Sequence, residues 1–98
     1  MKYVLSELAE FDIDEIFDYG NYKFGKERAI NYLIGLQSHF EALSLNPGIG
    51  RSRNEIKTGL LSFPCQSHII FYRILDTHIR IIRVLHGSRD LPSHFSTI

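Results

Sequence analysis

The chain has 98 residues and balanced charge, with 11 Lys and Arg against 11 Asp and Glu. This length fits one domain spanning residues 1–98, and a hydrophobic content of 44% argues against intrinsic disorder. No apolar run approaches the roughly 20 residues that a membrane helix needs, and the N-terminal apolar stretch is too short for a signal peptide. A single cysteine, Cys65, excludes an internal disulfide. We therefore expect a cytoplasmic protein with no membrane association.

The charge is unevenly distributed. Residues 1–50 hold four basic and eight acidic side chains, a net of −4, whereas residues 51–98 hold seven and three, a net of +4, with four of the five histidines. The basic half suits an anionic partner. Attraction between the two halves explains the same pattern equally well.

The first half of the chain predicts a strand followed by two helices. Lys2–Leu5 is a short strand, and Ser6 is a good N-cap for a helix. One helical stripe is apolar, namely Ala9, Ile13, Ile16, Phe17, Gly20 and Phe24. The opposite face is acidic and is expected to be solvated, namely Glu10, Asp12, Asp14, Glu15 and Asp18.

A second helix is predicted over residues 26–45. Its core stripe has Tyr32 beside it and consists of Ala29, Leu33, Leu36, Phe40 and Leu43. The short connection predicts an antiparallel helical hairpin, and the sequence Asn46-Pro47-Gly48 ends the second helix. A loop follows over residues 49–57. Glycines beside arginines in this region are only a weak sign of phosphate binding, because no strand precedes them.

The second half predicts three strands. Residues 60–63 form the first, Pro64 to Ser67 a turn, and residues 68–74 and 79–86 a hairpin of β-branched and aromatic residues. Strict alternation along 79–86 places Ile79, Ile81, Arg83 and Leu85 on one face and Arg80, Ile82, Val84 and His86 on the other. Both faces are mostly apolar, so we expect a cover on each, and few residues remain to form the second.

The order of elements predicts an α+β fold. We expect a small antiparallel sheet, made of the N-terminal strand at the edge of a C-terminal three-stranded meander, with the helical hairpin on one face. Asp90 to Phe95 should form a short helical turn.

Cysteine and histidine give weak site signals. A structural zinc site needs four ligands from paired motifs, and the sequence offers only Cys65, His68 and His86, at the wrong spacing. We therefore predict no metal and no cofactor. As a nucleophile, Cys65 lacks an adjacent base in the sequence, and we interpret it as a small turn residue.

The basic half holds the most informative residues. Arginines on a small sheet can hold RNA phosphates, and Glu55 or His86 could serve in acid–base catalysis, which describes a small ribonuclease. The alternative is that Arg73 and Arg83 meet carboxylates of a protein partner. The candidate residues for binding a partner or a target are Arg51, Arg53, Arg73, Arg83, His86 and Arg89.

Several segments together resemble one family. These are Tyr3-Val4-Leu5-Ser6 with Ala9, then Tyr32, Leu36 and Phe40, then Asn46 to Arg51, then Gly59-Leu60 with Ser62-Phe63-Pro64, and finally Ser67 to Arg73 and Arg83 to His86. Over nearly the whole chain the sequence resembles the ParE toxins of the ParE/RelE superfamily. Where these toxins commonly have glycine, this chain has Gln66 and His78, which affects turn geometry.

The resemblance implies the toxin of a type II toxin–antitoxin pair, acting in plasmid or chromosome maintenance. It implies a ParD-like antitoxin that covers the second sheet face, DNA gyrase as the target, and contact with operator DNA only through the antitoxin. ParE toxins are inhibitors, so no catalytic residue is expected. The alternative is a RelE-type, ribosome-dependent mRNA interferase. The absence of a tyrosine after Tyr72 weakens it, whereas Glu55, Arg73 and His86 keep it open. A third possibility is an inactive member of the family retained only as a DNA-binding co-repressor partner.

Overall fold

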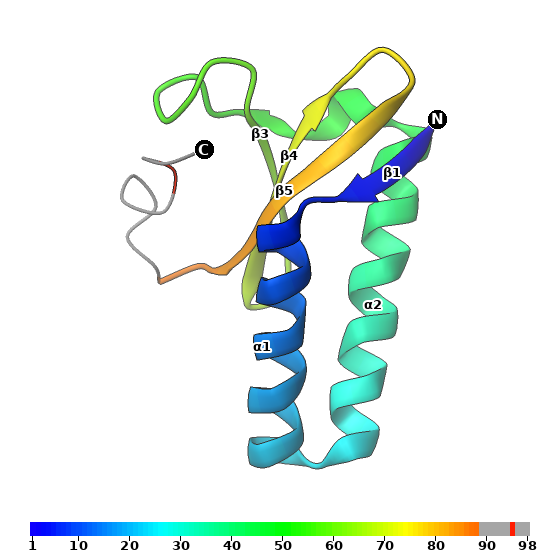
Figure 1. Ribbon diagram of the computed structural model, residues 1–98, viewed down its shortest axis with the longest axis vertical. Helices are drawn as coiled ribbons and strands as arrows, with labels where there is room; N and C mark the ends of the chain where they lie inside the picture. Colours follow the sequence, from blue (N-terminus) through cyan, green and yellow to red (C-terminus); the bar gives the residue numbers. More distant parts are fainter. Residues whose placement is uncertain (89–94, 96–98) are drawn as a thin grey trace.

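The computed structural model describes residues 1–88 and 95. Two long helices, α1 and α2, form an antiparallel hairpin that packs on a sheet and extends beyond one end of it (Figure 1). No helix in the described part of the chain is long and apolar enough to cross a membrane. The elements are β1 (Lys2–Leu5), α1 (Glu7–Phe24), α2 (Lys26–Leu45), the 3-10 helix η1 (Pro47–Ile49), β2 (Arg51–Ser52), β3 (Leu61–Cys65), β4 (His68–Ile74) and β5 (His78–His86).

The sheet is mixed, with strand order β1-β5-β4-β3-β2. The predicted α+β fold, the meander β3-β4-β5 and the edge position of β1 are confirmed. The prediction of an entirely antiparallel sheet is wrong at one pair, because β1 runs parallel to β5. A long helical connection can return the chain in either direction. The strand β2 lies within the predicted loop 49–57, and two residues are too short to show alternation.

The start of α1 is tied to the sheet by its cap. The Ser6 hydroxyl oxygen accepts a hydrogen bond from the Ala9 N–H at 3.0 Å and donates to the Ile82 carbonyl at 2.7 Å. The predicted N-cap is therefore confirmed, and it also joins the helix to β5. At the far end of the helical hairpin, Gly25 has a φ of 94°, a conformation that glycine adopts without strain.

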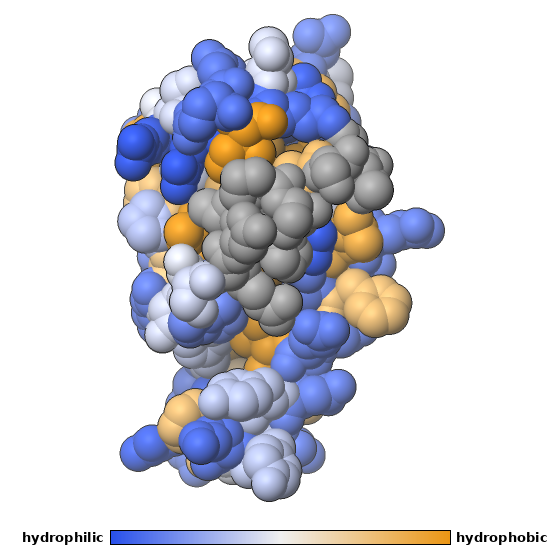
Figure 2. Space-filling view, turned by 90° about the vertical axis from the view of Figure 1, so that its left-hand side faces the viewer, coloured by the Kyte–Doolittle hydropathy of each residue, from blue (hydrophilic) through white to orange (hydrophobic). Residues whose placement is uncertain are grey.

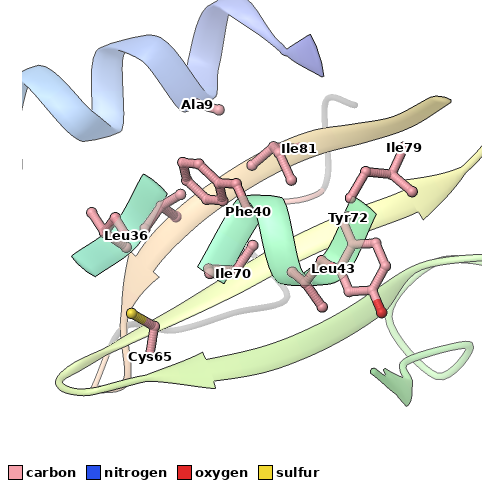
Figure 3. Close-up of a cluster of buried hydrophobic side chains, with 10 residues drawn as sticks. Ala9, Leu36, Phe40, Leu43, Cys65, Ile70, Tyr72, Ile79 and Ile81 are labelled. Carbon is pink, nitrogen blue, oxygen red and sulfur yellow. The ribbon is translucent and has the colours of Figure 1, made fainter. Parts of the chain in front are cut away.

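The main core lies between the helical hairpin and the sheet. In Figure 3, side chains of α2 point toward β4 and β5, and Ala9 of α1 lies above them. The predicted α2 stripe is confirmed, with Leu36 and Leu43 almost fully buried. Phe24, the last residue of the predicted α1 stripe, is instead 56% exposed, because the tip of the hairpin extends beyond the sheet.

The opposite face of the sheet is covered by the chain itself. Leu60, Phe71, Ile82 and Leu85 are buried there together with Phe95, whose ring lies 4.8 Å from that of Phe71. The expectation that the second face awaits a partner is therefore wrong: residues around Leu60 and at Phe95 supply the cover. Apart from Phe95, the predicted turn at 90–95 lies outside the described residues.

A β-bulge changes which residues of β5 face the helices. Phe71 pairs with Arg83 but Tyr72 pairs with Ile81, so Ile82 is an extra residue. The predicted alternation is thus wrong beyond this point, and Ile79, Ile81 and Val84 all lie in the helix-facing core. Sequence alternation cannot reveal a bulge because it assumes a constant period of two.

The turn between β3 and β4 is shorter than predicted. Pro64 and Cys65 belong to β3, and only Gln66 and Ser67 lie between the strands. Pro64 is tolerated because β2 pairs with β3 only at Leu61 and Ser62, which leaves an open edge at the proline. Gln66 adopts a φ of 57°, the strained conformation for which the family commonly has glycine.

Candidate functional site

An open groove of ≈ 890 Å³ lies between the helical hairpin and the ends of β4 and β5, and we call it the hairpin groove. Both helices and both strands line it, along with Ser67 before β4 and Ser88 after β5. Its lining consists of Asp12, Glu15, Ile16, Asp18, Tyr19, Gly20, Phe24, Arg28, Ala29, Tyr32, Ser67, His68, Val84, Leu85, His86 and Ser88.

Much of the hairpin groove is apolar. Ile16, Val84 and Leu85 line its inner part, and two aromatic side chains stand at the helical side, Tyr19 at 61% and Phe24 at 56% exposure. Solvent-exposed aromatic side chains that cluster beside other apolar groups are typical of protein-binding surfaces. The hairpin groove is therefore suited to an amphipathic segment of another protein.

Asp12, which lines the groove, is paired with Arg83 of β5. The Asp12 carboxylate accepts two hydrogen bonds from the Arg83 guanidinium, each of 2.8 Å, and one of 3.0 Å from the Val84 N–H. Hydrogen bonding to Asp12 raises the pKa of Arg83 despite its partial burial, and Glu15 adds to the effect. The prediction that Asp12 is solvated is wrong. Position 12 lies three residues after Ala9 and four before Ile16, on the buried side of the helix.

The pairing of Arg83 bears on its predicted role. Its side chain is only 14% exposed and is held by a carboxylate of the same chain. The rim of the groove adds two further acids, Glu15 and Asp18, against one base, Arg28. A segment bound here would meet apolar and acidic groups, so cationic side chains suit it better than the carboxylates that we expected to meet Arg83.

Two histidines meet at the strand end of the groove. His68 and His86 are cross-strand partners, and their rings lie 5.5 Å apart, edge to face. His68 Nδ1 also lies 2.5 Å from the Tyr32 hydroxyl, whose pKa burial raises. His86 Nδ1 lies 2.8 Å from the exposed Ser88 hydroxyl. The predicted candidate His86 is thus part of the groove.

Cys65 lies in the core beside His39. Its Sγ atom is 3.3 Å from His39 Nδ1, and the residue is 2% exposed. Burial raises the pKa of the thiol, which disfavours the nucleophilic thiolate. Among residues 1–88 and 95, no group of three or more His, Cys, Asp and Glu is arranged to hold a metal.

Three other candidate arginines lie on the sheet face that points away from the helices, namely Arg51, Arg53 and Arg73. Arg53 donates to the Ser62 hydroxyl at 2.9 Å, pairs with Glu55 at 3.1 Å, and lies over the Phe71 ring. Arg73 donates to the Thr58 carbonyl at 3.2 Å. The pKa of the Glu55 carboxyl is lowered, first by a hydrogen bond from the backbone N–H of Glu55 itself and then by Arg53 and Arg51.

The candidate residues do not form one cluster. His86 pairs with His68 at the start of β4, whereas Arg73 lies five residues further along that strand, about 16 Å away. His86 belongs to the groove, and Arg51, Arg53 and Arg73 belong to the outer sheet face. Arg89 lies outside the described residues. Sequence reasoning missed Tyr19, Phe24 and Arg80, although unpaired aromatic residues at the end of a helix were a usable signal.

Comparisons with known proteins identify the family of this chain. The sequence model of the family described as "ParE toxin of type II toxin-antitoxin system, parDE" matches residues 3–91. Toxin ParE1 of Caulobacter vibrioides is 35% identical over 92 residues, covering 94% of this chain and 95% of its own length. Toxin ParE1 of Mycobacterium tuberculosis is 35% identical over 91 residues, with 92% and 93% covered.

The fold is also found in a solved structure, described as the chromosomal ParDE TA system from P. aeruginosa. The TM-score is 0.77 at 21% identity, with 88% of this chain and 95% of that chain covered. The sequence and fold matches together define a toxin component of a type II toxin–antitoxin system. The chain belongs to the ParE toxin family.

Proposed function

We propose that this toxin inhibits DNA gyrase in the cytoplasm and is neutralised by a ParD-like antitoxin seated in the hairpin groove. Membership of the ParE family supports the toxin role, and the ParDE structure with the same fold supports the partner. Of the predicted site residues, His86 would contact the antitoxin. Arg51, Arg53 and Arg73 would face the target as the complex of gyrase with DNA, while Arg83 would shape the groove through Asp12.

The observation that carries this proposal is the exposure of aromatic side chains in the groove. Tyr19 and Phe24 are more than half exposed beside the buried apolar residues Val84 and Leu85. A few buried aromatic anchors supply most of the affinity in protein interfaces. The groove therefore offers an antitoxin segment the contacts that tight neutralisation requires.

The same structure offers little support for a ribonuclease. General acid–base catalysis needs its groups within hydrogen-bond reach of one substrate. His86 lies at one end of the β4–β5 hairpin and Arg73 near the other, and Glu55 is an exposed residue paired with Arg53. We therefore propose an inhibitor that acts by binding.

The proposal is tested by inducing the full chain in a bacterium with sensitive gyrase, with and without a ParD-like antitoxin. We expect DNA breaks and filamentous cells with the toxin alone and normal growth with the antitoxin. In vitro, the purified toxin should stabilise gyrase on cleaved DNA. Translation arrest with mRNA cleavage and intact DNA would instead identify an interferase.

A further inference from the structure

The outer face of the sheet carries one basic side chain at or beside each of its five strands. Lys2 lies on β1, Arg80 on β5, Arg73 on β4 and Arg51 on β2, while the side chain of Arg53 lies on Ser62 of β3. We call these five residues the basic stripe. Adjacent strands are about 4.8 Å apart, so the stripe spans about 19 Å.

Strand register places all five side chains on one face. Tyr72 beside Arg73, and Ile79 and Ile81 on either side of Arg80, belong to the helix-facing core, so both arginines point the other way. Tyr3 packs on Phe40, which directs Lys2 outward. Arg51 pairs with Ser62, which in turn pairs with Phe71 of the outer face.

The charges of the stripe are largely uncompensated. Arg73 and Arg80 are directly opposite each other on adjacent strands, an arrangement of like charges that destabilises a sheet. In the described part of the chain, the ion pairs are Arg53–Glu55 and Arg83–Asp12. Glu55 also interacts with Arg51 at longer range, whereas no described carboxylate forms an ion pair with Lys2, Arg73 or Arg80. An anionic ligand would relieve this repulsion.

The surroundings favour a nucleic acid over a protein as that ligand. A protein partner needs apolar anchors, yet Leu60, Phe71 and Ile82 of this face are already buried by the chain itself. Val4 on the edge strand β1 is 41% exposed, but it is a small anchor. Figure 2, which views the molecule from the left-hand side of Figure 1, shows hydrophilic residues around the upper part of this face, with smaller hydrophobic areas between them.

The aromatic residues distinguish a duplex from a single strand. Proteins that bind single strands stack the bases on exposed aromatic rings. On the outer face Phe71 and Phe95 are buried, and the exposed rings of Phe11, Tyr19, Tyr22 and Phe24 lie on α1. A row of basic side chains with no exposed aromatic ring among the described residues beside it suits the regularly spaced phosphates of a double helix.

We propose that the basic stripe binds the phosphate backbone of duplex DNA directly, without sequence preference. This contact differs from our expectation that DNA is reached only through the antitoxin. The choice of DNA over duplex RNA rests on the proposed function, because gyrase holds DNA where the toxin would act. The acidic residues of α1, on the other side of the sheet, would point away from the DNA, so the charge asymmetry of the fold would orient the toxin.

The test is fluorescence anisotropy of a labelled 20-base-pair DNA duplex titrated with the purified full chain at several salt concentrations. Non-specific complexes of this kind have Kd values of roughly 10⁻⁴–10⁻⁶ M. We expect Arg73→Gln with Arg80→Gln to weaken binding about tenfold or more, and to reduce the slope of log K against log salt by about 1.8. The matched control, Lys23→Gln with Lys26→Gln at the helical tip, removes the same charge and should change neither.

Three results would overturn the proposal. They are no binding by the wild type at low salt, equal losses in the two double variants, and tighter binding of single-stranded DNA or of RNA than of duplex DNA. A loss of antitoxin affinity in Arg73→Gln with Arg80→Gln, without a loss of DNA binding, would show that the stripe serves a protein instead. Gyrase inhibition by the same variants is scored separately, so failure of DNA binding would leave the proposed target standing.

Discussion

Asp12 of α1 and Arg83 of β5, 71 residues apart in the chain, join helix and sheet through two parallel hydrogen bonds of 2.8 Å. The Val84 N–H donates to the same carboxylate, and both side chains are largely buried. Paired guanidinium and carboxylate groups in this geometry make strong, directional bonds. The pair therefore fixes the angle at which the helical hairpin leaves the sheet, and with it the width of the hairpin groove.

Removing Asp12 should destabilise the fold severely. Asp12→Ala leaves the guanidinium of Arg83 and the Val84 N–H partly buried without their acceptor, and breaking such a pair costs about 3 kcal/mol of unfolding free energy. Urea denaturation followed by circular dichroism measures the change. Asp14→Asn, on the exposed face of the same helix, should change the stability by less than about 0.5 kcal/mol. Equal effects of the two substitutions would show that the Asp12–Arg83 pair contributes nothing.

Local patterns in the sequence predicted most of the fold. The N-cap Ser6, the apolar stripe of α2 and the break at Pro47 each depend on near neighbours in the chain, so periodicity and turn chemistry reveal them. The parallel pairing of β1 and the bulge at Ile82 depend on how distant segments meet, which no local pattern records.

The candidate site was less predictable for the same reason. The charge count identified a basic half, but only strand register shows that Arg80 stands opposite Arg73 and that His86 lies at the other end of β4. In the sequence, Asp12 is one of five acidic residues on a helix face that we predicted to be exposed to solvent. Its partner is 71 residues away, so its burial appears only when the helix is placed against β5.

Gly50 should tolerate no side chain. The Tyr72 hydroxyl donates to the Pro47 carbonyl at 2.6 Å and accepts from the Gly50 N–H at 2.9 Å, and a Cβ at position 50 would lie 2.2 Å from that hydroxyl. Gly50→Ala should therefore cost about 1–3 kcal/mol in urea denaturation. Gly48→Ala is the control, because a Cβ there meets nothing within 4 Å. A neutral Gly50→Ala would mean that the η1 turn shifts freely away from Tyr72.

Stability should fall in alkaline solution. Burial raises the pKa of Cys65 above its ordinary value of 9.0, and those of Tyr32 and Tyr72 above 10.0. The unfolded chain then loses these protons at lower pH than the folded chain, so the stabilisation is complete below about pH 9 and is lost as the pH rises through the folded-state values. Thermal unfolding from pH 7 to 11 measures this. Cys65→Ala should flatten the first part of the decline, and an unchanged profile in that variant would exclude the thiol as its cause.

Loss of the groove aromatics should weaken antitoxin binding and leave the fold intact. Tyr19 and Phe24 line the hairpin groove and are more than half exposed, so they contribute little to the core but are placed to contact a bound segment. Tyr19→Ala or Phe24→Ala should each raise the Kd for a ParD-like antitoxin about tenfold, equivalent to about 1.4 kcal/mol, as measured by isothermal titration calorimetry. Tyr22→Ala removes an aromatic ring that is 89% exposed on the same helix but lies outside the groove, and it should bind like the wild type. If all three variants keep wild-type affinity, the antitoxin binds elsewhere on the toxin.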